Sequence, residues 1–144
     1  MTRRTGRLLT LLAVVAMGAC HGGAPQAPQP KASPFPGTWR FVSGRYTQPG
    51  GSIQAFDSTQ LQVIKVISAT HFAYVTQAGT SFVRAGAGTY RFDAATYTEH
   101  LEHTSQDNMR GNDYTFTYRF DGDTWYHTGD VNGTKLQEVY RRVK

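Results

Sequence analysis

The chain has 144 residues and a formal net charge of +5 at pH 7, from 15 Lys and Arg residues against 10 Asp and Glu residues. Aromatic residues make up 12% of the sequence and charged residues only 17%, which excludes an intrinsically disordered chain. The length allows one domain with a short appendage, and the single cysteine excludes both an internal disulfide framework and a multi-cysteine zinc site.

Residues 1–19 are predicted to be a secretory signal peptide. Three arginines within the first seven residues form a basic start, and an apolar run over 8–17 leads to the small residues Gly18 and Ala19. This order is typical of secretory signals. The run is about half of the ~20 residues that a membrane-spanning helix needs. A buried helix of the core is the alternative, and it fits the basic start less well.

The lone cysteine follows this run directly. Met17-Gly18-Ala19-Cys20 resembles the lipobox of bacterial lipoproteins, in which cleavage before the cysteine leaves a thiol that carries a diacylglycerol. The resemblance implies that Cys20 is lipidated and anchors the protein to a membrane. Because His21 stands where an aspartate would redirect sorting, it also implies the outer membrane of a bacterial envelope. Met17 departs from the usual leucine, so ordinary cleavage to a soluble periplasmic or secreted protein is the alternative.

Residues 20–36 are predicted to be a tether that begins at the lipidated cysteine. Five of the six prolines lie here among alanines and glutamines, a composition typical of a semi-extended linker. Four of the 15 basic residues precede residue 37, whereas all ten acidic residues follow it. The segment 37–144 therefore has 11 basic and 10 acidic residues and a net charge of only +1. The basic balance therefore belongs to the export signal and predicts no nucleic-acid partner.

Residues 37–144 are predicted to form an all-β domain, because β-branched and aromatic residues recur in short runs separated by turn signals. Loops are expected over 47–60 and 104–113. Eight or nine consecutive strands joined by tight turns favour an up-and-down antiparallel barrel over a Greek-key sandwich. The predicted strands are 38–46, 61–67, 71–77, 81–85, 87–93, 96–103, 114–120, 124–130 and 135–143.

The last hairpin can be read in register. Asn132-Gly133 is the strongest short hairpin signal of the chain, because both central residues of a type I′ turn need a positive φ. A two-residue loop at this position places Trp125 opposite Tyr140 and His127 opposite Glu138. The second pair could form a charge-assisted hydrogen bond.

A second two-residue loop is predicted at Asp121-Gly122, which places Tyr118 opposite Trp125 and Phe116 opposite His127. Since side chains alternate between the two faces of a strand, the three last strands share one inner face. Its predicted members are Tyr114, Phe116, Tyr118, Phe120, Trp125, His127, Leu136, Glu138, Tyr140 and Arg142.

A third loop at Ala94-Ala95 places Tyr90 opposite Glu99, and it also puts His103 on the inner face. The strands within 61–85 have apolar residues on both faces, so the pattern does not orient them.

The predicted interior combines tyrosines and tryptophans with the charged or titratable groups of Glu99, His127, Glu138 and Arg142. An unpaired charge costs several kcal/mol to bury, so these groups must pair, meet water or contact a ligand. An eight-stranded barrel is just wide enough to be filled by side chains or to hold one small ligand. The sequence leaves both alternatives open.

The start of the domain carries a family resemblance. Gly37-Thr38-Trp39 resembles the G-x-W start of lipocalin-like barrels, in which a basic residue of the last strand packs over the tryptophan. Arg142 matches that residue, and Arg141 is the alternative. Over 37–144 the chain is similar to a family of small secreted bacterial lipocalin-like proteins of unassigned function. The resemblance implies a barrel with a pocket and no known ligand. The matching stretches are 70–72, 88–90, 96–99, 123–127 and 135–142.

The predicted function is that of an envelope-anchored lipocalin-like barrel that binds a small, partly apolar or amphipathic ligand. One alternative is a side-chain-filled barrel that serves as a structural or interaction domain. The other is an enzyme in which His127 with Glu138, or Glu99, acts as general base. The predicted ligand-binding residues are Trp39, His71, Tyr90, Tyr97, Glu99, Trp125, His127, Glu138, Tyr140 and Arg142.

No cofactor or metal is expected. His100 and His103 lie three positions apart, so on one strand they point to opposite faces and cannot share an ion. Gly86-Ala87-Gly88 lacks the third glycine of a dinucleotide-binding loop, and the sequence contains no phosphate-binding P-loop.

Overall fold

The computed structural model describes residues 32–144. The predicted signal peptide, the lipidation of Cys20 and the tether up to residue 31 lie outside the described residues and stay predictions. Within 32–144, no helix has both the length and the apolar character needed to cross a membrane.

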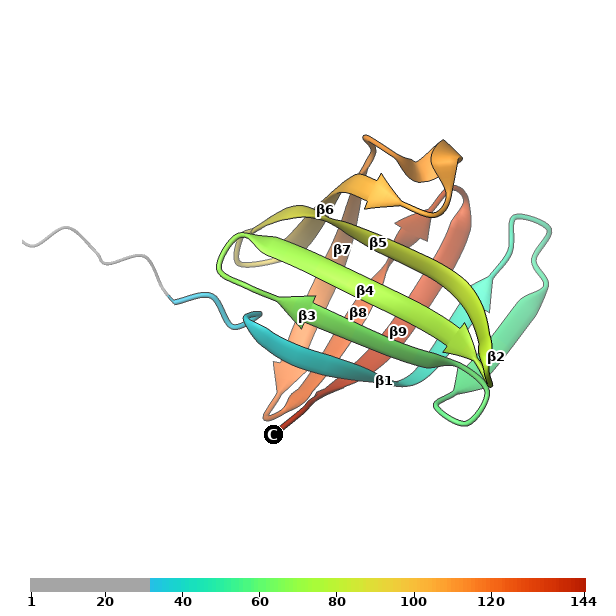
Figure 1. The fold of residues 1–144 in the computed structure, drawn as a ribbon, viewed down its shortest axis with the longest axis horizontal. Helices are drawn as coiled ribbons and strands as arrows, with labels where there is room; N and C mark the ends of the chain where they lie inside the picture. Colours follow the sequence, from blue (N-terminus) through green and yellow to red (C-terminus); the bar gives the residue numbers. More distant parts are fainter. Residues whose placement is uncertain (1–31) are drawn as a thin grey trace, which may run out of the picture. The chain divides into compact units, whose positions relative to one another are not determined.

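The described part of the chain contains nine strands and one 3₁₀ helix (Figure 1). The all-β prediction is confirmed, with two differences. Residues 81–92 form one long strand, and a further short strand forms within the predicted loop 47–60. The elements are β1 (Gly37–Thr47), β2 (Ile53–Asp57), β3 (Gln62–Ile67), β4 (His71–Ala78), β5 (Ser81–Phe92), β6 (Thr96–Thr104), η1 (Asp107–Met109), β7 (Asp113–Asp121), β8 (Thr124–Val131) and β9 (Thr134–Arg142).

The strands form an up-and-down barrel, as predicted. From β3 to β9 each strand pairs antiparallel with the next along the chain, and β1 pairs with both β3 and β9 to close the barrel. The first residues of β1, 37–40, pair with β3, whereas residues 43–47 pair with β2 on the same side. β2 is therefore an extra strand that extends the wall beside β3.

Strand β5 continues through residue 86, which separated the predicted strands 81–85 and 87–93. Gly86 and Gly88 face inward, and a Cβ at Gly88 would overlap the backbone carbonyl oxygen of His100 on β6. Glycine therefore allows the close approach of two strands here and does not end β5.

The predicted β8–β9 register is confirmed: Trp125 pairs with Tyr140 and His127 with Glu138. The β7–β8 turn differs from the prediction by one position, because Tyr118 pairs with His127 and the loop is Gly122-Asp123. Gly122 has a φ of +54° and takes the first central position, where type II′ turns favour glycine. The correction moves each pairing by two residues, so the predicted inner face is preserved.

The β5–β6 register follows the prediction at Tyr90 and Glu99 and then departs from it. An irregularity between Ala87 and Gly88 shifts the pairing at the end of β6. His103 lies beyond this shift and is exposed, so its predicted place on the inner face was wrong. A β-bulge changes which face the following residues occupy, and the alternation of the sequence does not reveal it.

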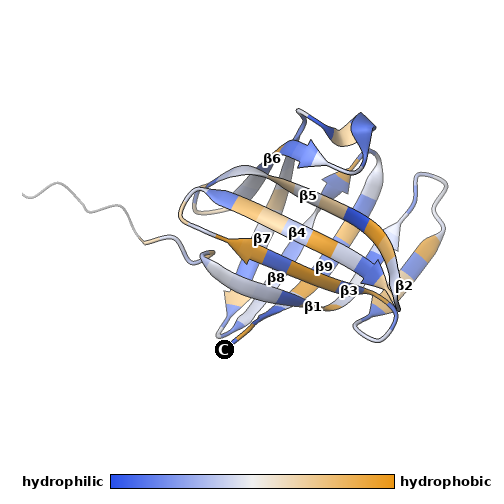
Figure 2. Ribbon diagram, in the orientation of Figure 1, coloured by the Kyte–Doolittle hydropathy of each residue, from blue (hydrophilic) through white to orange (hydrophobic). Residues whose placement is uncertain are grey.

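Strands β3 and β4 receive their orientation only from the closed barrel. Val63, Lys65 and Ile67 point inward from β3, while Ile64 and Val66 on the same strand are partly exposed. In Figure 2 apolar colour runs along β3 and recurs on β4, and on β3 the two outward residues Ile64 and Val66 are 37% and 49% exposed. Lys65 is thereby brought into the interior between two apolar residues.

The segment before β1 closes one end of the barrel. Phe35 is fully buried and packs against the rings of six aromatic residues. Residues 33–36 were predicted to belong to the tether, and the structure corrects this, since the barrel domain begins before residue 37. The six partners of Phe35 are Tyr90, Phe92, Tyr97, Tyr118, Phe120 and Trp125.

Arg142 holds this segment in place. Its guanidinium donates hydrogen bonds to the carbonyl oxygens of Pro34 (2.8 Å) and Pro36 (2.6 Å), and it lies 4.1 Å from the ring centroid of Trp39. The Trp39 indole N–H donates to the Phe35 carbonyl oxygen at 2.8 Å. The packing of a last-strand arginine over the G-x-W tryptophan, which the resemblance implied, is therefore present.

Candidate functional site

A cavity of about 400 Å³ lies in the barrel, toward the end that carries the β1–β2 loop, η1 and the β8–β9 turn (Figure 1). Gln48, Asn108 and Asn132, which belong to these connections, contribute to its lining. Six aromatic residues contribute to its wall, and four acidic or basic side chains that are nearly buried reach it from four different strands. These four, Lys65, Glu99, His127 and Glu138, are called the buried polar cluster below. The aromatic lining residues are Tyr46, Phe56, Tyr74, Tyr114, Phe116 and Tyr140.

Glu138 is the most strongly hydrogen-bonded member of the buried polar cluster. Its carboxylate accepts hydrogen bonds from the hydroxyls of Tyr46 (2.7 Å) and Tyr140 (3.0 Å), and the His127 Nδ1 atom lies 3.4 Å away. Burial by itself would raise the pKa of Glu138. The His127 ring, the Lys65 charge and the Tyr46 hydroxyl outweigh burial and lower this pKa to about 2, so Glu138 is ionised.

Lys65 and Glu99 form a buried ion pair. The Lys65 Nζ atom lies 2.5 Å from a carboxylate oxygen of Glu99, and the two side chains are only 5% and 8% exposed. The same ammonium lies between 5.5 and 5.7 Å from four ring centroids, which is within the range of cation–π attraction. These rings belong to Phe72, Tyr74, Trp125 and Tyr140. Sequence reasoning missed Lys65 because the alternation within 61–85 did not orient β3.

The His127 imidazole is neutral at pH 7. Burial lowers the pKa of its imidazole, and this effect outweighs the nearby Glu138 carboxylate. The ring packs between Phe116 and Trp125, with centroid distances of 3.9 and 5.0 Å. Neither ring nitrogen has a hydrogen-bond partner among the described residues, although the ring is 2% exposed.

Two further polar side chains that line the cavity also lack partners in the described part of the chain. The Thr76 hydroxyl is buried without a hydrogen bond, and so is the Nε atom of Arg84, which pairs with Thr76 across β4 and β5. Burial raises the pKa of Tyr74 to about 12, and the Arg84 charge opposes that rise, which indicates that the guanidinium lies near this ring. The sequence pattern did not identify either residue.

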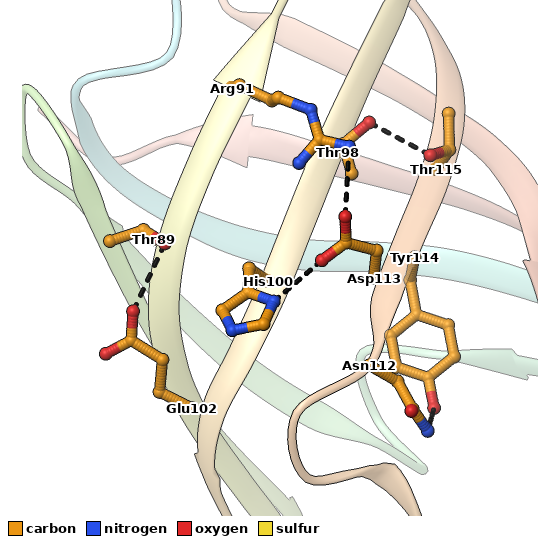
Figure 3. Close-up of polar contacts among 9 residues, drawn as sticks. All are labelled: Thr89, Arg91, Thr98, His100, Glu102, Asn112, Asp113, Tyr114 and Thr115. Atoms are coloured by element: carbon orange, nitrogen blue, oxygen red, sulfur yellow. Dashed lines mark hydrogen bonds and ion pairs between the residues drawn. The ribbon is translucent and has the colours of Figure 1, made fainter.

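Polar side chains on the outside of β5, β6 and β7 satisfy one another (Figure 3). The Asp113 carboxylate binds His100 at 2.7 Å and Arg91 at 3.0 Å, and these hydrogen bonds lower the pKa of Asp113. Thr98 and Thr115 share a hydrogen bond of 2.9 Å. In residues 32–144, no group of three or more His, Cys, Asp or Glu side chains could hold a metal ion.

The structure divides the ten predicted ligand-binding residues into three groups. Glu99, His127, Glu138 and Tyr140 line the cavity. His71 is exposed at the start of β4, where its Nδ1 atom lies 2.7 Å from the Thr70 hydroxyl, so it does not join the interior. The other five, Trp39, Tyr90, Tyr97, Trp125 and Arg142, surround the N-terminal segment at the closed end.

The family described as "Domain of unknown function (DUF4488)" matches residues 34–144. A solved lipocalin-like protein from Bacteroides uniformis is 16% identical, with a TM-score of 0.49, and the alignment covers 75% of this chain and 97% of that one. An uncharacterized protein from Bacteroides eggerthii is 18% identical, with a TM-score of 0.47 and coverage of 75% and 98%. No curated protein matches the chain.

Proposed function

This chain belongs to the DUF4488 family of domains of unknown function, and we propose that its barrel binds a small, partly apolar ligand. The observation that carries the proposal is the cavity of about 400 Å³, which lies within the range of ~300–1,000 Å³ typical of ligand pockets. Aromatic walls with a few convergent polar groups are the usual lining of such pockets.

The two alternatives predicted from the sequence differ in their support. A side-chain-filled barrel has no room for a ligand, and a cavity of this size argues against that alternative. The enzyme alternative stays a prediction. It requires His127 or Glu99 to take a proton from a substrate. The Glu138 carboxylate, the partner of His127 in that alternative, already accepts hydrogen bonds from two tyrosine hydroxyls.

The proposal is tested with N-phenyl-1-naphthylamine, an uncharged probe whose fluorescence rises in apolar surroundings. We expect saturable binding by the purified protein. The Val63→Phe substitution should weaken it by at least ~10-fold, a loss of ~1.4 kcal/mol, because Val63 lines the cavity and the added ring atoms would occupy it.

Val66→Phe is the matched control, since Val66 lies on the same strand and is 49% exposed on the outer face. Its probe affinity should equal that of the unsubstituted protein. Denaturation curves of both variants establish that each is folded at the assay temperature. Absence of probe binding, or equal affinities for the two variants, would contradict a ligand site in the barrel.

A further inference from the structure

Three polar side chains that line the cavity, His127, Thr76 and Arg84, carry hydrogen-bond donors without a partner among the described residues. Lys65 has three N–H donors, and within residues 32–144 Glu99 is its one hydrogen-bonded partner. Neutral His127 carries one N–H, and neither of its ring nitrogens has a partner in the described chain. The Thr76 hydroxyl and the Arg84 Nε–H are likewise unpartnered there. A buried donor without a partner costs about 1–3 kcal/mol, so this wall favours a ligand that supplies acceptors.

The acceptors of the buried polar cluster are mostly in use. Both carboxylate oxygens of Glu138 accept tyrosine hydroxyls, and one oxygen of Glu99 accepts the Lys65 ammonium. Three of the four carboxylate oxygens are therefore occupied. A ligand cation would find little free carboxylate and would share the cavity with two protein cations, Lys65 and Arg84.

Arg84 differs from Lys65 in having no counter-ion among residues 32–144. Both side chains line the cavity, but of the two only Lys65 forms an ion pair with a described residue. The guanidinium presents its N–H donors in a planar fork that matches the two oxygens of a carboxylate. The unpartnered Thr76 hydroxyl lies on the neighbouring strand, at the position that pairs with Arg84.

We propose that the ligand is an amphiphile with a single carboxylate, which Arg84 binds with help from the Thr76 hydroxyl. This inference rests on the proposed function and names the chemical class of the ligand. A monoanion fits better than a doubly charged phosphate, because Glu99 and Glu138 line the same cavity and repel each added negative charge. The apolar body of the ligand lies against the apolar side chains of the lining, which include Phe56, Leu61, Val63, Met109 and Leu136.

The test uses three probes of equal chain length that differ only in the head group: decanoate, decanol and decylamine. Each displaces N-phenyl-1-naphthylamine from the purified protein at pH 7, below its aggregation concentration. We expect decanoate to displace the probe at a concentration at least ~10-fold lower than the other two, since hydrogen bonds to charged groups contribute about 1.5–3 kcal/mol.

Substitutions locate the head group. Arg84→Gln should remove the preference for decanoate while leaving displacement by decanol unchanged, and Arg84→Lys should retain part of the preference because the charge remains. Arg91→Gln is the matched control. Arg91 lies on the same strand, but its guanidinium is on the outside and pairs with Asp113, so the preference should not change.

The outcomes separate the two proposals. If the probe binds but decanol or decylamine competes as well as decanoate, or if Arg84→Gln keeps the preference, the carboxylate proposal is overturned and the cavity remains a binding site. If the probe does not bind, both proposals are overturned.

Discussion

At the scale of single residues, the buried ion pair of Lys65 and Glu99 is the contact of the interior whose stability depends most on both partners being present. Both side chains are less than a tenth exposed, so each depends on the other for compensation of its charge. A buried pair contributes little net stability relative to apolar residues of the same shape. Removal of one partner is costly, because it leaves an uncompensated charge.

We therefore expect Lys65→Met to lower the free energy of unfolding by about 3–5 kcal/mol, measured by urea denaturation. The double variant Lys65→Met/Glu99→Gln should recover most of that loss, because neither side chain of the pair then carries a charge. Equal destabilisation in the single and double variants would show that the ion pair is not what makes Lys65 necessary.

His127 gives the protein a pH-dependent stability with a definite sign. Burial lowers the pKa of its imidazole in the folded state below the ordinary value of 6.5, so at mildly acidic pH the unfolded chain binds the extra proton. The contribution of His127 to stability is present above pH 6.5 and is lost as the pH falls below it. Glu138 adds a separate loss only below about pH 4.5, its ordinary pKa, down to its folded value of about 2.

The unfolding free energy should accordingly decrease between pH 7 and pH 5, and His127→Gln should flatten that decrease. His71→Gln provides the control, because the exposed His71 side chain lies outside the barrel interior. If the decrease in unfolding free energy between pH 7 and pH 5 persists in His127→Gln and disappears in His71→Gln, the pH dependence comes from His71 and the prediction is wrong.

At the scale of elements, two irregularities in the sheet decide which side chains reach the cavity. In a regular strand Phe82 and Arg84 would share one face. A register shift between β4 and β5 lies between their pairing positions, and Phe82 is 59% exposed while Arg84 lines the cavity. The shift in the β5–β6 pairing has a similar consequence for His103. Bulges of this kind redirect side chains without a clear signal in the alternation of the sequence.

The segment before β1 is a structural element in spite of its proline-rich composition. We expect Phe35→Ala to destabilise the protein by about 3–5 kcal/mol, because the ring is fully buried among six aromatic partners and its removal leaves a cavity. Phe82→Ala is the matched control on β5, where the ring is 59% exposed, and its effect should stay within about 0.5 kcal/mol.

Thermal or urea denaturation of the two variants measures the difference directly. Similar stabilities for Phe35→Ala and Phe82→Ala would mean that residues 33–36 only rest on the barrel. A larger loss for Phe35→Ala would establish that the folded domain includes them.

At the scale of the whole barrel, the two ends are built differently. Phe35, Trp39 and Arg142 fill the end where β1 begins, and most of the predicted aromatic site forms this solid core. The cavity and the buried polar cluster lie on the other side, toward the β1–β2 loop and η1. The aromatic excess of the sequence therefore serves two purposes: closure of one end and lining of a cavity toward the other.

The sequence by itself determined the fold class, the Asn132-Gly133 hairpin and the inner face of the last three strands. These depend on local turn chemistry and on the two-residue period of a strand, both of which can be read along the chain. Only the tertiary structure decided that Lys65 points inward, that Phe35 closes one end and that His71 stays outside. Those positions depend on contacts between residues far apart in the sequence, and on bulges that change the facing of a strand without changing its composition.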